Sequence, residues 1–226
     1  ATLEHLAALA VLHRTHAAMH PDAHMTEAIT LDDVANARTI SDPLRLLDCC
    51  LISDGGAAFI VSAGETAGDM KKSSPAILGA GQGHTHEHIL AAPSLTSFGC
   101  KMSSATAFGK AGVTTSDIDV AEIYDSFTIT LLIELESIGF YEKGEAGEAA
   151  LRGELTHGGK MPCNTHGGLL SFGHSGAAGG MFHIVEAVRQ LRGEADIRQV
   201  PDANLAFVHG DGGILSAHCS MILGNI

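Results

Sequence analysis

The hydrophobic pattern predicts a helix at the start of the chain. Between residues 2 and 20, leucine and valine recur at helical spacing among good helix formers, and a proline follows directly (Leu3, Leu6, Leu9, Val11, Leu12, Pro21). A complete α/β domain usually opens with a strand. We therefore expect a chain that begins inside a helix to be a fragment, a processed chain or one subunit of a split protein.

Apolar runs and amphipathic stretches alternate along the rest of the chain. The run AAFIVSA, which follows Asp54-Gly55-Gly56, predicts a buried strand, and the polar stretch from Gly64 to Ser74 is the expected domain boundary. Further strands are predicted at AILGAGQG, IDVAEIYDSF, LAFVHG and ILSAHCSMIL, and helices over residues 94–112, 127–138 and 181–192. This alternation predicts an α/β fold with a mixed sheet covered on both faces by helices.

Composition narrows the class of protein. The 226 residues include 27 glycines and no tryptophan, which favours a closely packed interior of small residues. A formal net charge of -13 disfavours a nucleic-acid partner, because such binding rests on clustered Lys and Arg. No apolar stretch approaches the roughly 18 to 20 residues of a membrane span. Five cysteines without CxxC spacing, in a sequence with no secretory leader, predict a reducing compartment, the cytoplasm.

A glycine-rich segment that leads into a predicted helix is the most informative part of the sequence. From Asn164 to Gly180 it reads NTHGGLLSFGHSGAAGG. Glycines before a helix let backbone amides approach a ligand oxygen or phosphate, and they leave the imidazole of His174 accessible. Taken alone, the segment is also explained by a connecting loop whose histidine caps a helix or binds a loop carbonyl.

This segment resembles the histidine motif of the thiolase superfamily. The family pattern Asn-x-x-Gly-Gly-(four residues)-Gly-His-x-x-Gly-Ala-x-Gly matches residues 164–180, except that Ala177 replaces a glycine. Three further motifs follow the family order. EIYDSF (residues 122–127) lies where thiolases have Asn-Glu-Ala-Phe, LAFVHGDGG (residues 205–213) lies on the closing strand motif Cys-x-Gly-Gly-Gly, and DGGAA (residues 54–58) matches Asp-Gly-Ala-Ala-Ala.

The resemblance implies the C-terminal half of a layered αβαβα fold, with a mixed five-stranded sheet covered by helices. By this analogy residues 1–65 comprise the end of the loop domain and a strand that returns to the N-terminal domain. Residues 66–226 then form the C-terminal domain. The family also implies a homo- or hetero-oligomer that handles acyl-coenzyme A as substrate, with no bound cofactor.

The resemblance assigns His174 the central role. In the family this histidine activates a nucleophilic cysteine and helps to hold the thioester oxygen, and an imidazole suits both tasks. The segment that carries the nucleophile has no counterpart in this sequence, so an N-terminal half or a partner subunit must supply it. None of the five cysteines takes that role, and Cys49 and Cys50 are expected to pack in the core.

Two other positions depart from the family pattern. His209 replaces the second family cysteine, an acid and base on the closing strand, and either transfers protons or is a loop histidine bonded to Asp211. Tyr124 replaces the residue that holds a catalytic water, and either donates to an oxyanion or packs at a strand end. Ser126 is a poor base at neutral pH, Cys163 is expected to pack, and the role of His166 is open. By analogy, substrate contacts are expected from Asn164, Gly167, Gly168, Gly173, Gly212 and Gly213.

No metal site is expected, although the chain has 14 histidines. His13, His16 and His20 fall on one face of the predicted helix, and we interpret them as a solvated face. The set His84-Thr-His86-Glu-His88 lies in what the family uses as a variable surface loop. The charged run from Glu142 to Glu148 is expected to be an exposed loop.

Three functions remain open at this point. The first is the C-terminal portion of a thiolase-type acyltransferase, which performs thiolysis of a 3-oxoacyl-CoA or the reverse Claisen condensation. The second keeps the fold but cleaves a β-hydroxyacyl-CoA in a retro-aldol reaction, which Tyr124 motivates. The third is a non-catalytic interaction or lipid-binding subunit, which the missing nucleophile motivates.

Overall fold

The structure is a computed structural model that describes residues 1–67 and 72–225. Its helices are α1 (Leu3–Ala17), α2 (Leu31–Asn36), α3 (Gly64–Ala67), α4 (Cys100–Ala111), α5 (Thr128–Ile138), α6 (Ala146–Leu151) and α7 (Gly179–Leu191). Its strands are β1 (Thr39–Ser41), β2 (Leu44–Arg45), β3 (Ala76–His84), β4 (Val120–Ile123), β5 (Leu205–Gly212) and β6 (Ala217–Gly224). No helix within the described residues is long and apolar enough to cross a bilayer.

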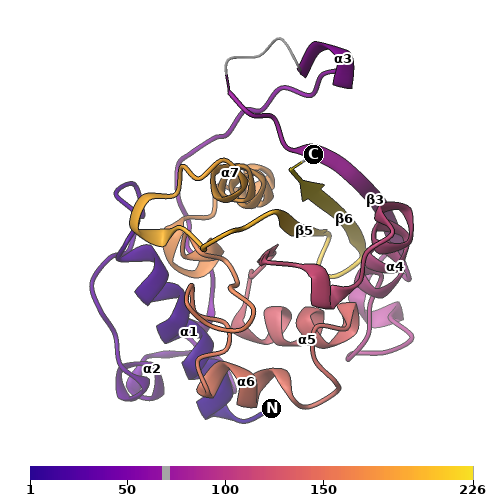
Figure 1. Ribbon diagram of the computed structural model, residues 1–226. Coiled ribbons are helices and arrows are strands. Elements are labelled where there is room, and N and C mark those ends of the chain that lie inside the picture. The colour runs from indigo at the N-terminus through magenta and orange to yellow at the C-terminus, as the bar shows by residue number, and fades with distance from the viewer. Residues whose placement is uncertain (68–71, 226) are drawn as a thin grey trace.

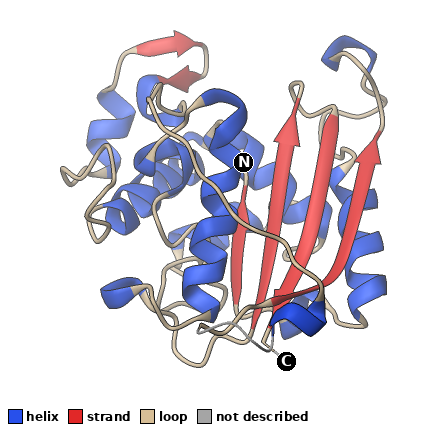
Figure 2. Cartoon of the chain, turned by 90° about the horizontal axis from the view of Figure 1, so that it is seen from above, coloured by secondary structure: helices blue, strands red, loops and turns tan. Residues whose placement is uncertain are grey.

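The central sheet is mixed, as the alternating pattern predicts. Its strand order is β3-β6-β5-β4, with β6 antiparallel to both neighbours and β4 parallel to β5. Figure 2 shows the strands side by side with helices on both sides. The sheet has four strands in the described part of the chain, so the expected fifth strand is absent from it.

Helices cover both faces of this sheet. Helix α7 lies over β4 and β5 on one face, while α4 and α5 lie against the other (Figure 1). The alternation along β5 matches this arrangement, because Ala206 and Val208 pack with residues of α7 and Phe207 packs with residues of α5. The two faces of one strand therefore belong to two different apolar clusters.

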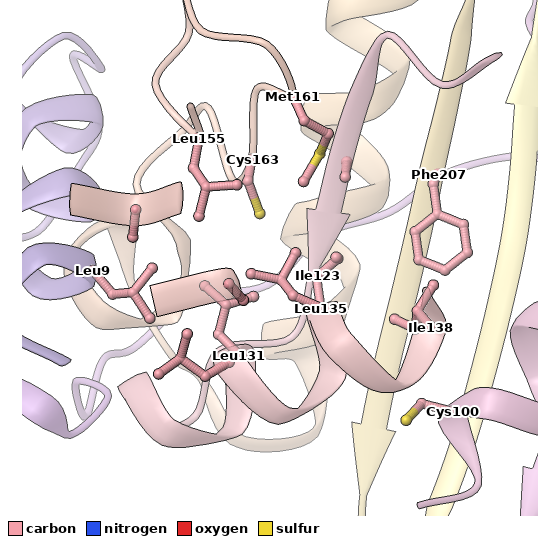
Figure 3. Packing of buried hydrophobic residues seen from close by; sticks show 14 of the residues in the cluster. Leu9, Cys100, Ile123, Leu131, Leu135, Ile138, Leu155, Met161, Cys163 and Phe207 are labelled. Atoms are coloured by element: carbon pink, nitrogen blue, oxygen red, sulfur yellow. The ribbon is translucent and has the colours of Figure 1, made fainter. Parts of the chain in front are cut away.

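The larger cluster joins the start of the chain to its second half. Figure 3 shows Leu9 of α1, Leu131 and Leu135 of α5 and Ile123 of β4 pointing into one core. Each of these side chains is fully buried. Burial of such side chains contributes roughly 1.5–3 kcal/mol apiece, so α1 is fixed against α5 and the end of β4.

Helix α1 is buried on nearly all sides, and the expected solvated histidine face is wrong. His13 and His16 are fully buried and His20 nearly so. Packing against α5, α6 and the segment 164–172 surrounds the helix. Backbone groups satisfy the buried rings, since Nδ1 of His13 contacts the carbonyl of Leu9 at 2.7 Å and Nδ1 of His16 contacts that of Asn164 at 3.1 Å.

The expected buried strand at AAFIVSA is also wrong. Residues 51–63 have no regular secondary structure, and the side chain of Ile60 is 92% exposed. An apolar strand needs a neighbouring strand for its backbone groups, and no such neighbour exists among the described residues. The polar stretch after it contains α3, and residues 68–71 of the expected boundary lie outside the described residues.

Other boundaries differ by several residues. Helix α4 begins at Cys100 rather than near residue 94, since residues 92–98 form bends and irregular backbone. The charged run from Glu142 ends in helix α6, where Gly147 is buried against the ring of His5. The run is thus exposed only in part.

Candidate active site

Tyr124 lies where β4 leaves the sheet. The strand ends at Ile123, and the backbone N–H of Tyr124 still donates to the carbonyl of His209 on β5 at 3.1 Å. In a parallel pair the carboxyl ends of both strands meet at one edge, where α/β folds commonly place their ligands. The backbone of Tyr124 is therefore held at that edge of the sheet, and its phenol extends from there.

Asn164 ties the glycine-rich segment to the same strand end. Its side-chain oxygen accepts from the N–H of Ile123 at 2.7 Å, and its side-chain nitrogen donates to the carbonyl of Ile123 at 2.7 Å. Asn164 has a φ of 50°, a left-handed conformation that asparagine tolerates better than most residues. The expected substrate contact is thus a buried clamp on the backbone next to Tyr124.

Asp125 provides a second clamp on the other side of Tyr124. Its carboxylate accepts from the backbone N–H groups of Leu169 and Leu170 at 2.8 and 3.2 Å. Gly168, with a φ of 61°, lies against this carboxylate so closely that a Cβ atom would collide with it. Gly167 is similarly pressed against Ala17 of α1. Both expected ligand-binding glycines are buried and serve the packing of the segment.

The two clamps bring His174 to Tyr124. Nε2 of His174 lies 2.9 Å from Oη of Tyr124, with the rings nearly perpendicular. On the other side of the imidazole, Nδ1 lies 3.4 Å from Sγ of Cys50. Cys50 is half-buried beside the site and does not pack in the core as expected.

A pocket of about 580 Å³ opens over this pair. Tyr124 and His174 line it together with Met181 and Ile184 of α7, and Gly212 and Gly213 form part of its rim. Gly173 lies apart from it and lines a neighbouring hollow with Ser53 and Phe182. The structure therefore brings together four of the predicted site residues, Tyr124, His174, Gly212 and Gly213.

Burial shifts the pKa of two groups that line this pocket, Tyr124 and Asp211, and of Cys50 beside it. Desolvation, followed by the charge of Asp211, raises the pKa of Tyr124 to about 12, and burial together with Asp125 raises the pKa of Cys50 to about 11. Both groups are therefore protonated at neutral pH. Burial and the nearby Glu134 raise the pKa of Asp211, which also lines the pocket, to about 8.

His209 does not lie with His174. It is fully buried and points to the opposite face of β5, where Nδ1 contacts Oγ of Ser220 at 2.9 Å and Nε2 contacts Nδ1 of His218 at 3.1 Å. Desolvation lowers its pKa to about 3. A hydrogen bond from His209 to Asp211, one of the two alternatives for this residue, is absent among the described contacts.

A buried acid and two histidines lie beneath Tyr124, and the sequence pattern missed them as a group. Oε2 of Glu122 lies 2.9 Å from Nδ1 of His166 and 3.3 Å from Nδ1 of His183. Although burial alone would raise it, these imidazoles lower the pKa of Glu122 to about 2. The carboxylate of Glu122 also accepts from the backbone N–H and the hydroxyl of Thr165, and so holds the glycine-rich segment as Asn164 and Asp125 do. His183 had no signal of its own, because it sits within an ordinary amphipathic helix.

The described residues contain two groups of ligand atoms close enough together for one metal ion. They are Glu122 with His166 and His183, and Glu134 with His209 and His218. The histidines from His84 to His88 form no such group.

Comparisons with known proteins agree with the motifs. Residues 81–225 match the family model described as Thiolase C-terminal domain-like. The chain is 35% identical to an acetyl-CoA acetyltransferase of Methanothermobacter thermautotrophicus over 96% of its length, which is 58% of that protein. It is 37% identical to a steroid side-chain-cleaving aldolase of Thermomonospora curvata over 99% of its length and 57% of the relative.

A solved structure titled Ltp2-ChsH2(DUF35) aldolase superposes on the whole chain. The TM-score is 0.91 at 37% identity, and the match covers 59% of that chain. The chain thus spans somewhat more than half the length of the relatives that it matches.

Proposed function

The chain belongs to the thiolase superfamily, and on that premise we propose that the complete protein cleaves a carbon–carbon bond of a β-hydroxyacyl-CoA. Tyr124 and His174 are its proton-transfer pair. The 2.9 Å contact between Oη of Tyr124 and Nε2 of His174, inside an open pocket, carries this proposal. The names of two similar proteins, an aldolase and an aldolase complex, support the same chemistry.

The reaction begins at the β-hydroxyl group of the substrate. Tyr124 accepts the hydroxyl proton on Oη as its own proton passes to Nε2 of His174. A phenol with a pKa of about 12 does not ionise alone at neutral pH, so it needs this imidazole as an acceptor. The Cα–Cβ electron pair moves onto Cα and the thioester oxygen, and a ketone or aldehyde leaves. The proton held by the pair then returns to Cα, which yields the shortened acyl-CoA.

Thiolysis of a 3-oxoacyl-CoA, or the reverse condensation, is the second candidate. The name of one similar protein, an acetyl-CoA acetyltransferase, supports it. In that function a cysteine from outside this chain is acylated and His174 activates it. The hydrogen bond between Oη of Tyr124 and Nε2 of His174 favours the first candidate, because it gives the phenol an acceptor for its proton.

Both functions require more than this chain. An N-terminal thiolase half or a partner subunit completes the pocket, the acyl-CoA is a substrate and not a resident cofactor, and the complete protein is an oligomer. The exposed apolar residues 58–61 support this assignment, because they provide strand-forming sequence for a sheet outside the chain.

Product analysis separates the candidates. The complete protein is incubated with a β-hydroxyacyl-CoA and with a 3-oxoacyl-CoA, each with and without added coenzyme A, and the products are identified by mass spectrometry. Release of a ketone or aldehyde without coenzyme A supports cleavage by retro-aldol chemistry. Strict dependence on coenzyme A supports thiolysis. Absence of turnover with both substrates, together with retained binding of a partner, favours a non-catalytic subunit.

A further inference from the structure

A second polar cluster lies on the other face of the sheet from the pocket. It comprises Glu134 of α5, His209 of β5 and His218 of β6, whose side chains are inaccessible to solvent. Both carboxylate oxygens of Glu134 lack a hydrogen-bond partner among the described residues. An unpaired buried carboxylate is costly, and such groups in proteins are usually paired or bound to a metal.

The separations of the three ligand atoms fit one metal ion. Nε2 of His209 lies 3.1 Å from Nδ1 of His218, and Oε1 of Glu134 lies 3.5 Å and 4.0 Å from these two nitrogens. The centre of this triangle is about 2.1 Å from each atom, which agrees with zinc bonds to imidazole and carboxylate of about 2.0–2.2 Å. Tetrahedral ligands stand about 3.4 Å apart and octahedral ones about 3.0 Å, so the cluster fits a zinc-like ion better than an octahedral one.

The outer nitrogens of both rings are held in the manner of metal-bound histidines. Nε2 of His218 donates to the carbonyl of Leu215 at 3.0 Å, which leaves a lone pair on Nδ1. Nδ1 of His209 contacts Oγ of Ser220, which contacts Oγ of Ser103 at 2.8 Å. When Ser103 donates to the carbonyl of Cys100, this chain of bonds leaves a lone pair on Nε2 of His209 as well. Second-shell bonds of this kind orient histidine ligands.

We propose that Glu134, His209 and His218 bind a divalent metal ion of the Zn²⁺ class. The ligands come from three elements and are inaccessible to solvent, so the ion joins α5 to the ends of β5 and β6 and is structural. Asp211 lies opposite His218 in the β5–β6 register, and its Oδ1 lacks a partner among the described residues, which makes it a candidate fourth ligand. The ion would also fix the turn after Gly212, which borders the pocket.

Metal analysis of the complete protein tests this site. The protein is stripped with a chelator, loaded with Zn²⁺, passed over a desalting column and analysed by mass spectrometry for bound metal. We expect one equivalent of Zn²⁺ that is lost in Glu134→Gln and in His218→Asn. Glu136→Gln, on the same helix, and the double variant His84→Asn and His88→Asn are matched controls that retain it.

A second set of measurements uses the wild-type protein alone, so that it tests the site even where a variant fails to fold. Zn²⁺ should raise the melting temperature of the wild-type protein, a chelator should reverse the shift, and Co²⁺ in its place should show the intense visible absorption of a four-coordinate ion. No retained Zn²⁺ and no shift in the wild type would overturn the proposal in favour of a proton shared by Glu134 and the two histidines. Retention of the same equivalent by folded Glu134→Gln would overturn it in favour of another site.

Discussion

Oη of Tyr124 and Nε2 of His174 meet at 2.9 Å although 50 residues separate them in the sequence. Tyr124→Phe removes the hydroxyl group and leaves the ring packing intact. Loss of a proton-transfer group typically costs 10²–10⁴-fold in rate, so we expect a fall of at least about 100-fold in kcat with an unchanged fold. Steady-state kinetics of the complete protein measure this. Tyr141→Phe, whose hydroxyl contacts Glu154, is the matched control and should stay within about threefold of wild type.

Cys50 lies beside the imidazole but is not expected to act as a nucleophile. Its pKa of about 11 keeps it a thiol at neutral pH, and thiols react through their thiolate form. We expect Cys50→Ala to keep activity within about tenfold. Intact-mass analysis during turnover should show no acyl adduct at this residue, and an adduct there would reverse the assignment.

Gly168→Ala should destabilise the protein strongly. Its φ of 61° costs a residue with a side chain about 1–2 kcal/mol, and the added methyl group would collide with the carboxylate of Asp125. We expect a loss of more than about 2 kcal/mol in the free energy of unfolding, measured by denaturant titration. Gly158→Ala, where a Cβ meets nothing within 4 Å, should change this free energy by less than about 1 kcal/mol.

The buried imidazole of His16 predicts a loss of stability in acid. The N–H of His157 donates to its Nε2, and burial lowers its pKa from 6.5 to about 4. The folded state therefore favours the neutral ring, and its contribution is complete above pH 6.5 and is lost as the pH falls toward 4. His16 alone should add one extra proton bound on unfolding in this window, or about 1.4 kcal/mol per pH unit, to the uptake by the other buried histidines. His16→Gln, whose amide can replace both bonds, should reduce the slope in pH-dependent denaturation. An unchanged slope would mean that His16 does not titrate on unfolding.

The exposed segment around Ile60 predicts that a charged substitution there lowers the melting temperature of the complete protein more than one at Ile197. Ile60 and Ile197 are 92% and 70% exposed in this chain. If residues 51–65 return to an N-terminal domain, Ile60→Lys should lower the melting temperature of the complete protein by several degrees, whereas Ile197→Lys should not. Equal effects would argue against that domain assignment.

The sequence predicts the elements with strong local patterns. Strands β3, β5 and β6 and helix α5 lie close to their expected positions, and the resemblance to the thiolase superfamily is confirmed. The strand expected around Ile60 fails because strand formation depends on a partner and not on apolar residues alone. The expectation for the histidines of α1 is wrong because an imidazole, although polar, packs inside a core when hydrogen bonds satisfy its nitrogens, as they do for His13 and His16.

The contacts within the site, like the strand partners, could not be predicted from local sequence patterns. His174 and Tyr124 could be chosen from motif positions, but their contact could not, since it depends on the bonds from Asn164 and Asp125. His209 lies on the same strand as the pocket rim, but the alternation of a strand turns it to the other face. A motif gives the order of residues along the chain. The face on which a residue lies follows from register and packing.

The clamps on either side of Tyr124 hold buried backbone, whereas the rim of the pocket is exposed. Asn164 and Asp125 hold the buried part of the glycine-rich segment, whereas residues 176–177 and 212–214 are exposed. Substitutions on that rim can alter the shape and polarity of the opening with little effect on the distance between phenol and imidazole. A designer who wishes to change the proposed acyl-CoA substrate therefore has a tolerant surface next to an intolerant core.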